Sequence, residues 1–324
     1  MKSQNTTSTT LPIIDLSGYQ QASHTQKQTL AAKIGEACRE FGFFYITGHG
    51  IETSLQTKLF SESAKLFDLP LESKLSVDKK LSKANRGYEP LRNQTLEAGT
   101  PPDLKEGFYI GFDHDDEHPM VKANKFNFGK NQWPTQRPNL KPVATEYLNT
   151  MTSLCEELMS LMALSLNLSE DYFNDFCHDP LVTVRLLHYP PQPVNPEENE
   201  KGCGAHTDFG GLTLLLQDEN GGLQVWSKKD EDWMDAPPIK GTYVVNIGDM
   251  IARWTNDQYR STLHRVINKS GNERYSIPFF FSGHLDHEVK CIPTCLPEGE
   301  SPKYAPTTVE KHMIEMYQKT YGDK

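Results

Sequence analysis

Apolar residues recur every three or four positions in two segments, the spacing that places them on one face of a helix. In residues 26–41, Leu30, Ile34 and Cys38 share such a face. The longer segment, residues 142–166, repeats the pattern and predicts a helix that packs against the rest of the fold rather than one that binds a cofactor. Two further helices are predicted at residues 54–67, ending before Pro70, and at residues 307–320.

Short apolar stretches alternate with turn residues between residues 182 and 290, the pattern of an all-β core. Another strand is predicted at residues 43–47, directly after the first helix. Residues 88–142 are irregular and rich in Pro, Gly and Asn, apart from a strand-like piece at 107–111. Long loops of this kind are usually functional or mobile. The chain is therefore predicted to be mainly β with flanking α-helices.

No internal repeat or clear linker divides the sequence. We expect a disordered tail at residues 1–10 and a single catalytic unit at residues 11–324. Within that unit, the pattern predicts an N-terminal region at 11–140, supporting helices at 141–181, a strand-rich core at 182–290, and a C-terminal loop and helix at 291–324.

The composition and net charge argue against some classes of binding partner. The net charge of −10 argues against nucleic acid or an anionic membrane as a partner. No apolar run approaches the roughly 18 residues of a membrane-spanning helix, and the polar start lacks an apolar signal core. The six cysteines show no disulfide framework, so reduced thiols are expected. We expect a cytoplasmic monomer.

Candidate chemistry begins with His206 and Asp208, which are two residues apart and point to the same side of a strand. His264 lies 264 − 208 = 56 residues later, a separation that suits an adjacent strand of an antiparallel barrel. Two imidazoles and one carboxylate leave coordination positions open, which is typical of a non-haem Fe(II) site rather than a closed structural zinc site.

A carboxylate-binding group follows. Arg274 and Ser276 share one strand face, where a guanidinium can grip a carboxylate with two hydrogen bonds and a hydroxyl can add a third. Tyr189 is a plausible further donor. Taken alone, His-x-Asp is more often structural and Arg-x-Ser means almost nothing, but the ordered set favours an iron site with a bound keto acid. His114 and His118 superficially resemble a second metal site, although a solvated acidic loop is the better interpretation.

The motifs resemble those of the isopenicillin N synthase-like, or plant-type, family of 2-oxoglutarate and Fe(II)-dependent dioxygenases. The similarity covers nearly the whole chain and is carried by these segments: residues 11–16, 40–51, 187–191, 206–215, 222–225, 246–249, 261–266 and 274–280.

The resemblance implies a distorted double-stranded β-helix, or jelly-roll, barrel. It implies His206, Asp208 and His264 as the catalytic iron ligands, and Arg274, Ser276 and Tyr189 as the residues that bind 2-oxoglutarate. The expected reaction uses O2, decarboxylates 2-oxoglutarate to succinate and CO2, and most often hydroxylates a small metabolite. Ascorbate is expected to support activity.

Two departures from the family pattern are Leu187, where members often carry Asn, and Asp257, where many carry Gly. An alternative is an oxidase of the isopenicillin N synthase or aminocyclopropane-carboxylate oxidase type, in which Arg274 and Ser276 hold a different carboxylate and 2-oxoglutarate is not used. A less favoured alternative is a non-catalytic relative that keeps the fold and the metal.

Substrate residues are inferred by analogy with the family and by shared strand faces. Two arginines would suit an acidic or phenolic small molecule, although Arg86 could instead form a surface salt bridge and Arg185 could be structural. The candidate substrate residues are Arg86, Tyr88, Arg185, Phe209 and Phe280.

Overall fold

The computed structural model describes residues 10–193 and 195–321. The expected tail at residues 1–10 lies outside this part of the chain, apart from Thr10. The helices are α1 (His24–Glu40), α2 (Thr53–Phe67), α3 (Leu71–Leu75), α4 (Pro119–Lys122), α5 (Leu140–Ser165), α6 (Asn174–Cys177), α7 (Asp249–Trp254) and α8 (Val309–Tyr321). The four helices predicted from sequence correspond to α1, α2, α5 and α8.

The largest sheet of the described residues has eight strands. Its strand order is β1-β2-β10-β7-β12-β5-β4-β3, and every pairing is antiparallel except that of β1 with β2. The bounds, in that order, are Ile13–Asp15, Phe43–Thr47, Tyr243–Ile247, Leu212–Gln217, Arg274–Gly283, Leu181–Tyr189, Glu106–Ile110 and Gly87–Glu89.

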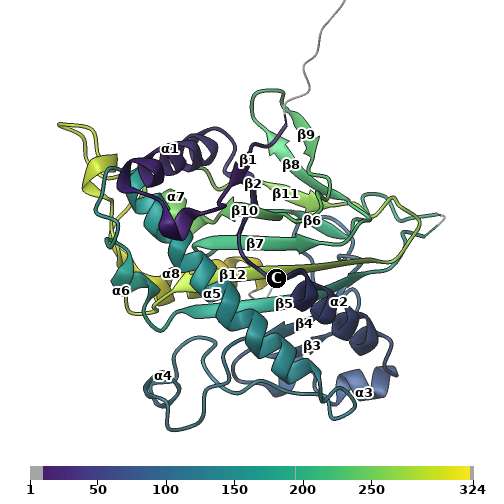
Figure 1. The fold of residues 1–324 in the computed structure, drawn as a ribbon. Coiled ribbons are helices and arrows are strands. Elements are labelled where there is room, and N and C mark those ends of the chain that lie inside the picture. Colours follow the sequence, from purple (N-terminus) through teal and green to yellow (C-terminus); the bar gives the residue numbers. More distant parts are fainter. Residues whose placement is uncertain (1–9, 194, 322–324) are drawn as a thin grey trace, which may run out of the picture.

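A smaller antiparallel sheet packs against one face of the larger one. Its order is β6-β11-β8-β9, with bounds Cys203–His206, His264–Val266, Leu223–Ser227 and Asp232–Asp235. An apolar cluster between the sheets draws Phe43, Leu187 and Val244 from the larger sheet and Val225 and Val266 from the smaller one. Figure 1 shows the two layers. A separate two-stranded ribbon pairs β13 (Glu288–Val289) with β14 (Thr307–Thr308).

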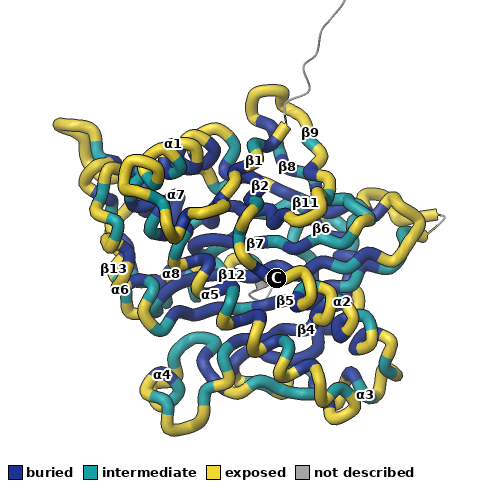
Figure 2. The backbone as a smooth tube through the Cα atoms, in the orientation of Figure 1, coloured by how far each residue is buried: buried dark blue, intermediate teal, exposed yellow. Residues whose placement is uncertain are grey.

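The opposite face of the larger sheet is covered by helices. Helix α5 crosses this face in Figure 1, and its buried residues include Leu148, Met151 and Leu158. They belong to the main apolar core, where α1 and α2 also pack on α5. Helix α1 begins at a capping box formed by Ser23 and Gln26. Figure 2 shows the resulting buried interior beneath an exposed helical and loop surface.

All six cysteines are free in the structure, in keeping with the expected reduced thiols. Within the described residues, none of the helices combines the length and apolar character needed to cross a membrane.

Strand β12 ends at a glycine that the fold requires. Gly283 has φ +78°, and a Cβ added there would lie 1.9 Å from the ring of Phe176. Gly271 has a similar φ of +75° but open space around it. The pair therefore separates the cost of a left-handed backbone from the cost of a steric clash.

We predict that Gly283→Ala lowers the free energy of unfolding by about 3 kcal/mol or more, because the ring of Phe176 must move in addition to the backbone strain. Gly271→Ala should cost only about 1 kcal/mol. Urea denaturation followed by circular dichroism measures both changes, and equal losses would contradict the clash.

Candidate metal and cosubstrate site

Two histidines face each other across neighbouring strands of the smaller sheet. His206 at the end of β6 is the register partner of His264 at the start of β11, and their ring centroids are 4.2 Å apart. Asp208 lies two residues beyond His206. Its Oδ1 is 3.7 Å from Nε2 of each histidine. The structure therefore brings together the three residues that the sequence predicted as metal ligands.

Hydrogen bonds orient each of these side chains. Nδ1 of His206 lies 2.8 Å from the carbonyl oxygen of Gly204, and Nδ1 of His264 lies 3.2 Å from that of Thr262. Protonated Nδ1 atoms can donate to these carbonyls, which leaves both Nε2 lone pairs free.

The carboxylate of Asp208 is fixed in the same manner by the larger sheet. Its Oδ2 accepts hydrogen bonds from the hydroxyl of Thr213 at 2.6 Å and the side-chain amide of Asn246 at 2.8 Å. Oδ1 is left to face the two imidazoles. Such outer contacts hold metal ligands in position and are themselves important for affinity.

The protonation states suit metal binding. Burial and, as a smaller cause, the adjacent imidazole of His206 lower the pKa of His264 to about 4. Burial also lowers the pKa of His206. Burial alone would raise the pKa of Asp208, but His264, His206 and its two hydrogen bonds lower it instead. Two neutral imidazoles and an ionised carboxylate are the forms that bind Fe(II), so the donor set fits this ion.

A guanidinium with an unused donor lies next to this triad. Arg274 is fully buried, its Nε donates to the carbonyl oxygen of Gly221, and its Nη2 donates to Gln217 at 3.2 Å. Among the described residues, Nη1 of Arg274 has no hydrogen-bond partner. A buried donor without a partner is costly, so a bound carboxylate is the natural complement.

The other predicted cosubstrate residues lie beside Arg274. Tyr189 is the cross-strand partner of Arg274, whose guanidinium lies 4.7 Å from the centre of the tyrosine ring. Ser276 is buried and hydrogen-bonds to Tyr189. These three residues and the metal triad line one cavity between the sheets.

Sequence reasoning missed Lys105, which also lines this cavity. Its buried ammonium forms an ion pair with Asp103 and lies 3.4 Å from the sulfur of Cys203. Lys105 precedes β4 and lies far from β6 in the sequence, so no local spacing connects it to Cys203. The roles of Thr213 and Asn246 were also not predicted, although both fall within the motif segments.

A second cavity shares His206 and Asp208 with the first. It is lined by four of the five predicted substrate residues: Arg86, Arg185, Phe209 and Phe280. Tyr88 is absent from the lining of both cavities, and its hydroxyl donates to Glu106 in the interior. Helix α8 supplies two lining residues that were not predicted, Met313 and Tyr317.

Comparison with known protein families agrees with this geometry. Residues 11–136 match the model of the non-haem dioxygenase in morphine synthesis N-terminal domain, and residues 178–283 match that of the 2OG-Fe(II) oxygenase superfamily. The geometry of the site therefore agrees with membership in a family of non-haem Fe(II) oxygenases.

Individual relatives extend the match over almost the whole chain. The 2-oxoglutarate-Fe(II) type oxidoreductase hxnY of Emericella nidulans is 46% identical, with 96% of this chain and 90% of the relative covered. The 2-oxoglutarate-dependent dioxygenase citB of Monascus ruber is 38% identical, with coverages of 97% and 96%. The crystal structure of Neurospora crassa T7H in complex with alpha-KG superposes with a TM-score of 0.84 at 31% identity, covering 98% of both chains.

The chain belongs to the 2-oxoglutarate/Fe(II)-dependent dioxygenase family. The predicted jelly-roll fold, the enzyme class and the use of Fe(II) and 2-oxoglutarate are thereby confirmed. The alternative of an oxidase that does not use 2-oxoglutarate is not favoured, because the relatives above are named for this cosubstrate.

The hydrogen bond from Thr213 to Asp208 can be tested by an almost isosteric change. We predict that Thr213→Val weakens Fe(II) binding about 10-fold or more, because Oδ2 of Asp208 loses a short hydrogen bond. Thr242→Val is the matched control, since Thr242 donates to the backbone oxygen of Ile239 away from the site. Anaerobic Fe(II) titration measures both, and equal affinities in the two variants would contradict this role.

Proposed function

We propose that His206, Asp208 and His264 hold the iron of this dioxygenase and that Arg274, Ser276 and Tyr189 hold 2-oxoglutarate. The observation that carries the proposal is the position of the unpartnered Nη1 of Arg274 in the same cavity as the triad. A cosubstrate with a keto acid at one end and a carboxylate at the other can reach both. When bound, iron supplies the centre at which O2 is used and 2-oxoglutarate is converted to succinate and CO2.

The protein's own contribution is positioning and exclusion of water. Arg274 and Ser276 fix one end of the cosubstrate, and the neutral imidazoles and the carboxylate of Asp208 fix the metal-binding end. Phe280 and Asp208 line both cavities. The apolar surroundings lower the local dielectric constant, which would strengthen the ion pair between Arg274 and a carboxylate of 2-oxoglutarate.

Arg274→Lys tests whether the guanidinium of Arg274 binds a carboxylate of 2-oxoglutarate, because the substitution retains the positive charge and changes the donor geometry. We predict a loss of 2-oxoglutarate affinity of about 10-fold to 100-fold, because an ammonium cannot reproduce the forked donor geometry of guanidinium. Anaerobic titration of the Fe(II) protein, followed by its visible charge-transfer band, measures this affinity. Arg253→Lys is the matched control, because Arg253 bonds the backbone oxygen of Ala305 outside both cavities. An unchanged affinity of Arg274→Lys for 2-oxoglutarate would show that Arg274 does not bind its carboxylate.

Relatives act on small molecules, and the Neurospora crassa structures include complexes with thymine and with 5-formyluracil. For this chain we propose an acidic or phenolic small-molecule substrate. Three basic side chains line the second cavity: Lys79, Arg86 and Arg185. Lys79 is paired with Glu89. The cavity keeps an excess of positive charge once Asp208 is assigned to the metal.

Arg86 is the strongest support for an acidic substrate. It is 2% exposed, and it donates to Thr183 and to the backbone oxygens of Asn127 and Val182. Within the described part of the chain it forms no ion pair. Burial lowers its pKa to about 10, so it remains charged at neutral pH. A buried cation without a carboxylate partner favours an anionic ligand. This placement differs from the surface salt bridge weighed for Arg86 from the sequence.

Arg185 lies between two rings at the border of the cavities. Its guanidinium carbon is 4.6 Å from the ring centre of Tyr109 and 4.7 Å from that of Phe280. Contact with the two rings restrains the guanidinium of Arg185 at the lining of the second cavity. An aromatic carboxylate or phenolate would meet both charge and apolar walls here. A monomeric state, a cytoplasmic location and support by ascorbate stay predictions.

Aromatic acids and their primary amides, compared as stimulants of succinate formation, test this substrate class. We predict that acids stimulate turnover and amides do not. In Arg86→Gln the KM for an active acid should rise about 10-fold or more with a smaller change in kcat, and Arg86→Lys should recover part of the loss. The control is Arg137→Gln, since Arg137 pairs with Glu62 away from the cavities. Equal stimulation by amides and an unchanged KM would refute an acidic substrate.

A further inference from the structure

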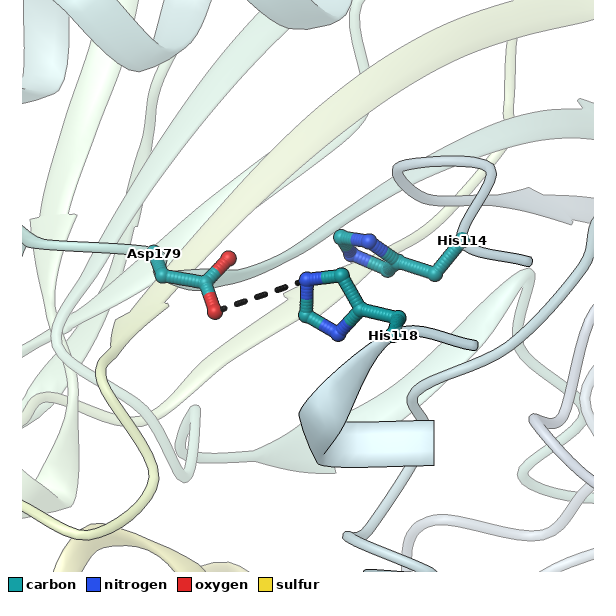
Figure 3. Close-up of side chains that lie close together, drawn as sticks. All are labelled: His114, His118 and Asp179. Atoms are coloured by element: carbon teal, nitrogen blue, oxygen red, sulfur yellow. Dashed lines mark ion pairs between the residues drawn. The ribbon is translucent and has the colours of Figure 1, made fainter. Parts of the chain in front are cut away.

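Three potential metal ligands meet outside the oxidation site. His114 lies in the loop after β4, His118 precedes α4, and Asp179 precedes β5. The sequence pattern favoured a solvated acidic loop for the two histidines. In Figure 3 both imidazoles and the carboxylate of Asp179 point toward one another. All three residues are half-buried, so a dissolved ion can reach them.

The spacing of these side chains is close to that of the iron triad. Nε2 of His118 is 3.8 Å from Oδ2 of Asp179, and the two imidazole centroids are 4.1 Å apart. One possible ligand atom from each of the three residues lies within 4.8 Å of the other two. The ligand atoms of His206, Asp208 and His264 also lie within 4.8 Å of one another. A tetrahedral ion with bonds of about 2.1 Å needs ligand atoms about 3.4 Å apart, so small side-chain rotations suffice.

Two of these side chains have unused lone pairs. Within the described residues, the ring of His114 and the carboxylate of Asp179 take part in no hydrogen bond. The contact of 3.8 Å between Oδ2 of Asp179 and Nε2 of His118 is too long to be a hydrogen bond. Burial and the neighbouring His118 lower the pKa of His114, which keeps its imidazole neutral and available as a ligand. The ring of His114 is also held in place by stacking on Phe128, with centroids 4.9 Å apart.

The backbone at Asp179 is unusual as well. Its φ of +43° lies in the left-handed region, which costs energy in a non-glycine residue. That conformation turns the chain into Pro180 and the start of β5. It also presents the carboxylate to a loop more than 60 residues earlier in the sequence, which no local turn requires.

We propose that His114, His118 and Asp179 form a second divalent-metal site, selective for ions of the Zn2+ class. Two imidazoles and one carboxylate suit such borderline ions, and the fourth position would be filled by water. A bound ion would connect the loop after β4 to the turn that precedes β5. Leu181 and Thr183 of β5 line the second cavity, in which we place the substrate. The metal would therefore stabilise one wall of that cavity.

Metal binding would change the hydrogen bonding of His118. Nδ1 of His118 now accepts a long hydrogen bond of 3.3 Å from the backbone N–H of Met120, so the ring proton lies on Nε2. Coordination through Nε2 moves that proton to Nδ1, and the N–H of Met120 loses its acceptor. The exchange of this amide with solvent therefore reports occupation of the site independently of catalysis.

The experiment uses the full chain with the iron triad removed by His206→Ala and His264→Ala. We expect this double variant to bind one equivalent of Zn2+ by calorimetry, to gain thermal stability on binding, and to show faster hydrogen exchange at the amide of Met120. Adding Asp179→Asn or His118→Ala should weaken Zn2+ binding about 10-fold or more. Asparagine tolerates a left-handed backbone, so Asp179→Asn leaves the turn in place.

His284→Ala added to the double variant is the matched control, because His284 is a half-buried imidazole stacked on His178, with centroids 6.1 Å apart. It should leave Zn2+ binding unchanged. The proposal is overturned if the double variant binds no Zn2+, or if Asp179→Asn and His118→Ala bind it as tightly as the control. Thermal unfolding without metal identifies any variant that fails to fold, and Asp179→Asn then decides the result.

Discussion

The register between β6 and β11 is the constraint on which the rest of the site depends. Both strands are short, and their pairing places His206 opposite His264. A shift by one residue would turn one imidazole to the other face of the sheet, because side chains alternate along a strand. The pairing of β11 with β8 adds a second set of contacts that fixes this register. The two imidazoles that we propose as iron ligands therefore come from the smaller sheet as a preassembled pair.

The carboxylate of Asp208 connects this pair to the larger sheet. Asp208 follows β6, but its Oδ2 is held by Thr213 on β7 and Asn246 on β10. Arg274 on β12 and Tyr189 on β5 come from the same sheet and face the same cavity. The complete site exists only when the two sheets close on each other, so the apolar cluster between them contributes to metal binding as well as to stability.

The sequence was sufficient wherever a local period carried the information. The two-residue spacing of His206 and Asp208, and that of Arg274 and Ser276, predicted shared faces that the structure places on one cavity. The helical periods predicted α1 and α5 to within two residues at each end. The resemblance of ordered motifs predicted the fold and the enzyme class, because it added long-range information that periodicity lacks.

Contacts between distant segments could not be read in this way. Lys105 approaches Cys203, and Asp179 approaches His118, through chain crossings that leave no local pattern. Tyr88 shows the opposite case: it lies two residues from Arg86, yet its hydroxyl donates to Glu106, which is also paired with Lys74 in the interior. Arg86 lies outside β3, so the alternation of side chains along a strand does not place the two residues on one face. Proximity in a motif therefore predicted the segment but not the side chain that reaches the cavity.

The two cavities are built from different parts of the chain and meet at a few shared residues. The cavity that contains Arg274 is lined by strands of both sheets, whereas the second cavity adds the loop at Arg86 and helix α8. Arg185 and Phe280 line both cavities, as do His206 and Asp208. Under the proposed function, changes in this loop and in helix α8 would alter the second cavity at positions that do not hold the metal, while the shared lining residues would link the occupation of one cavity to the shape of the other.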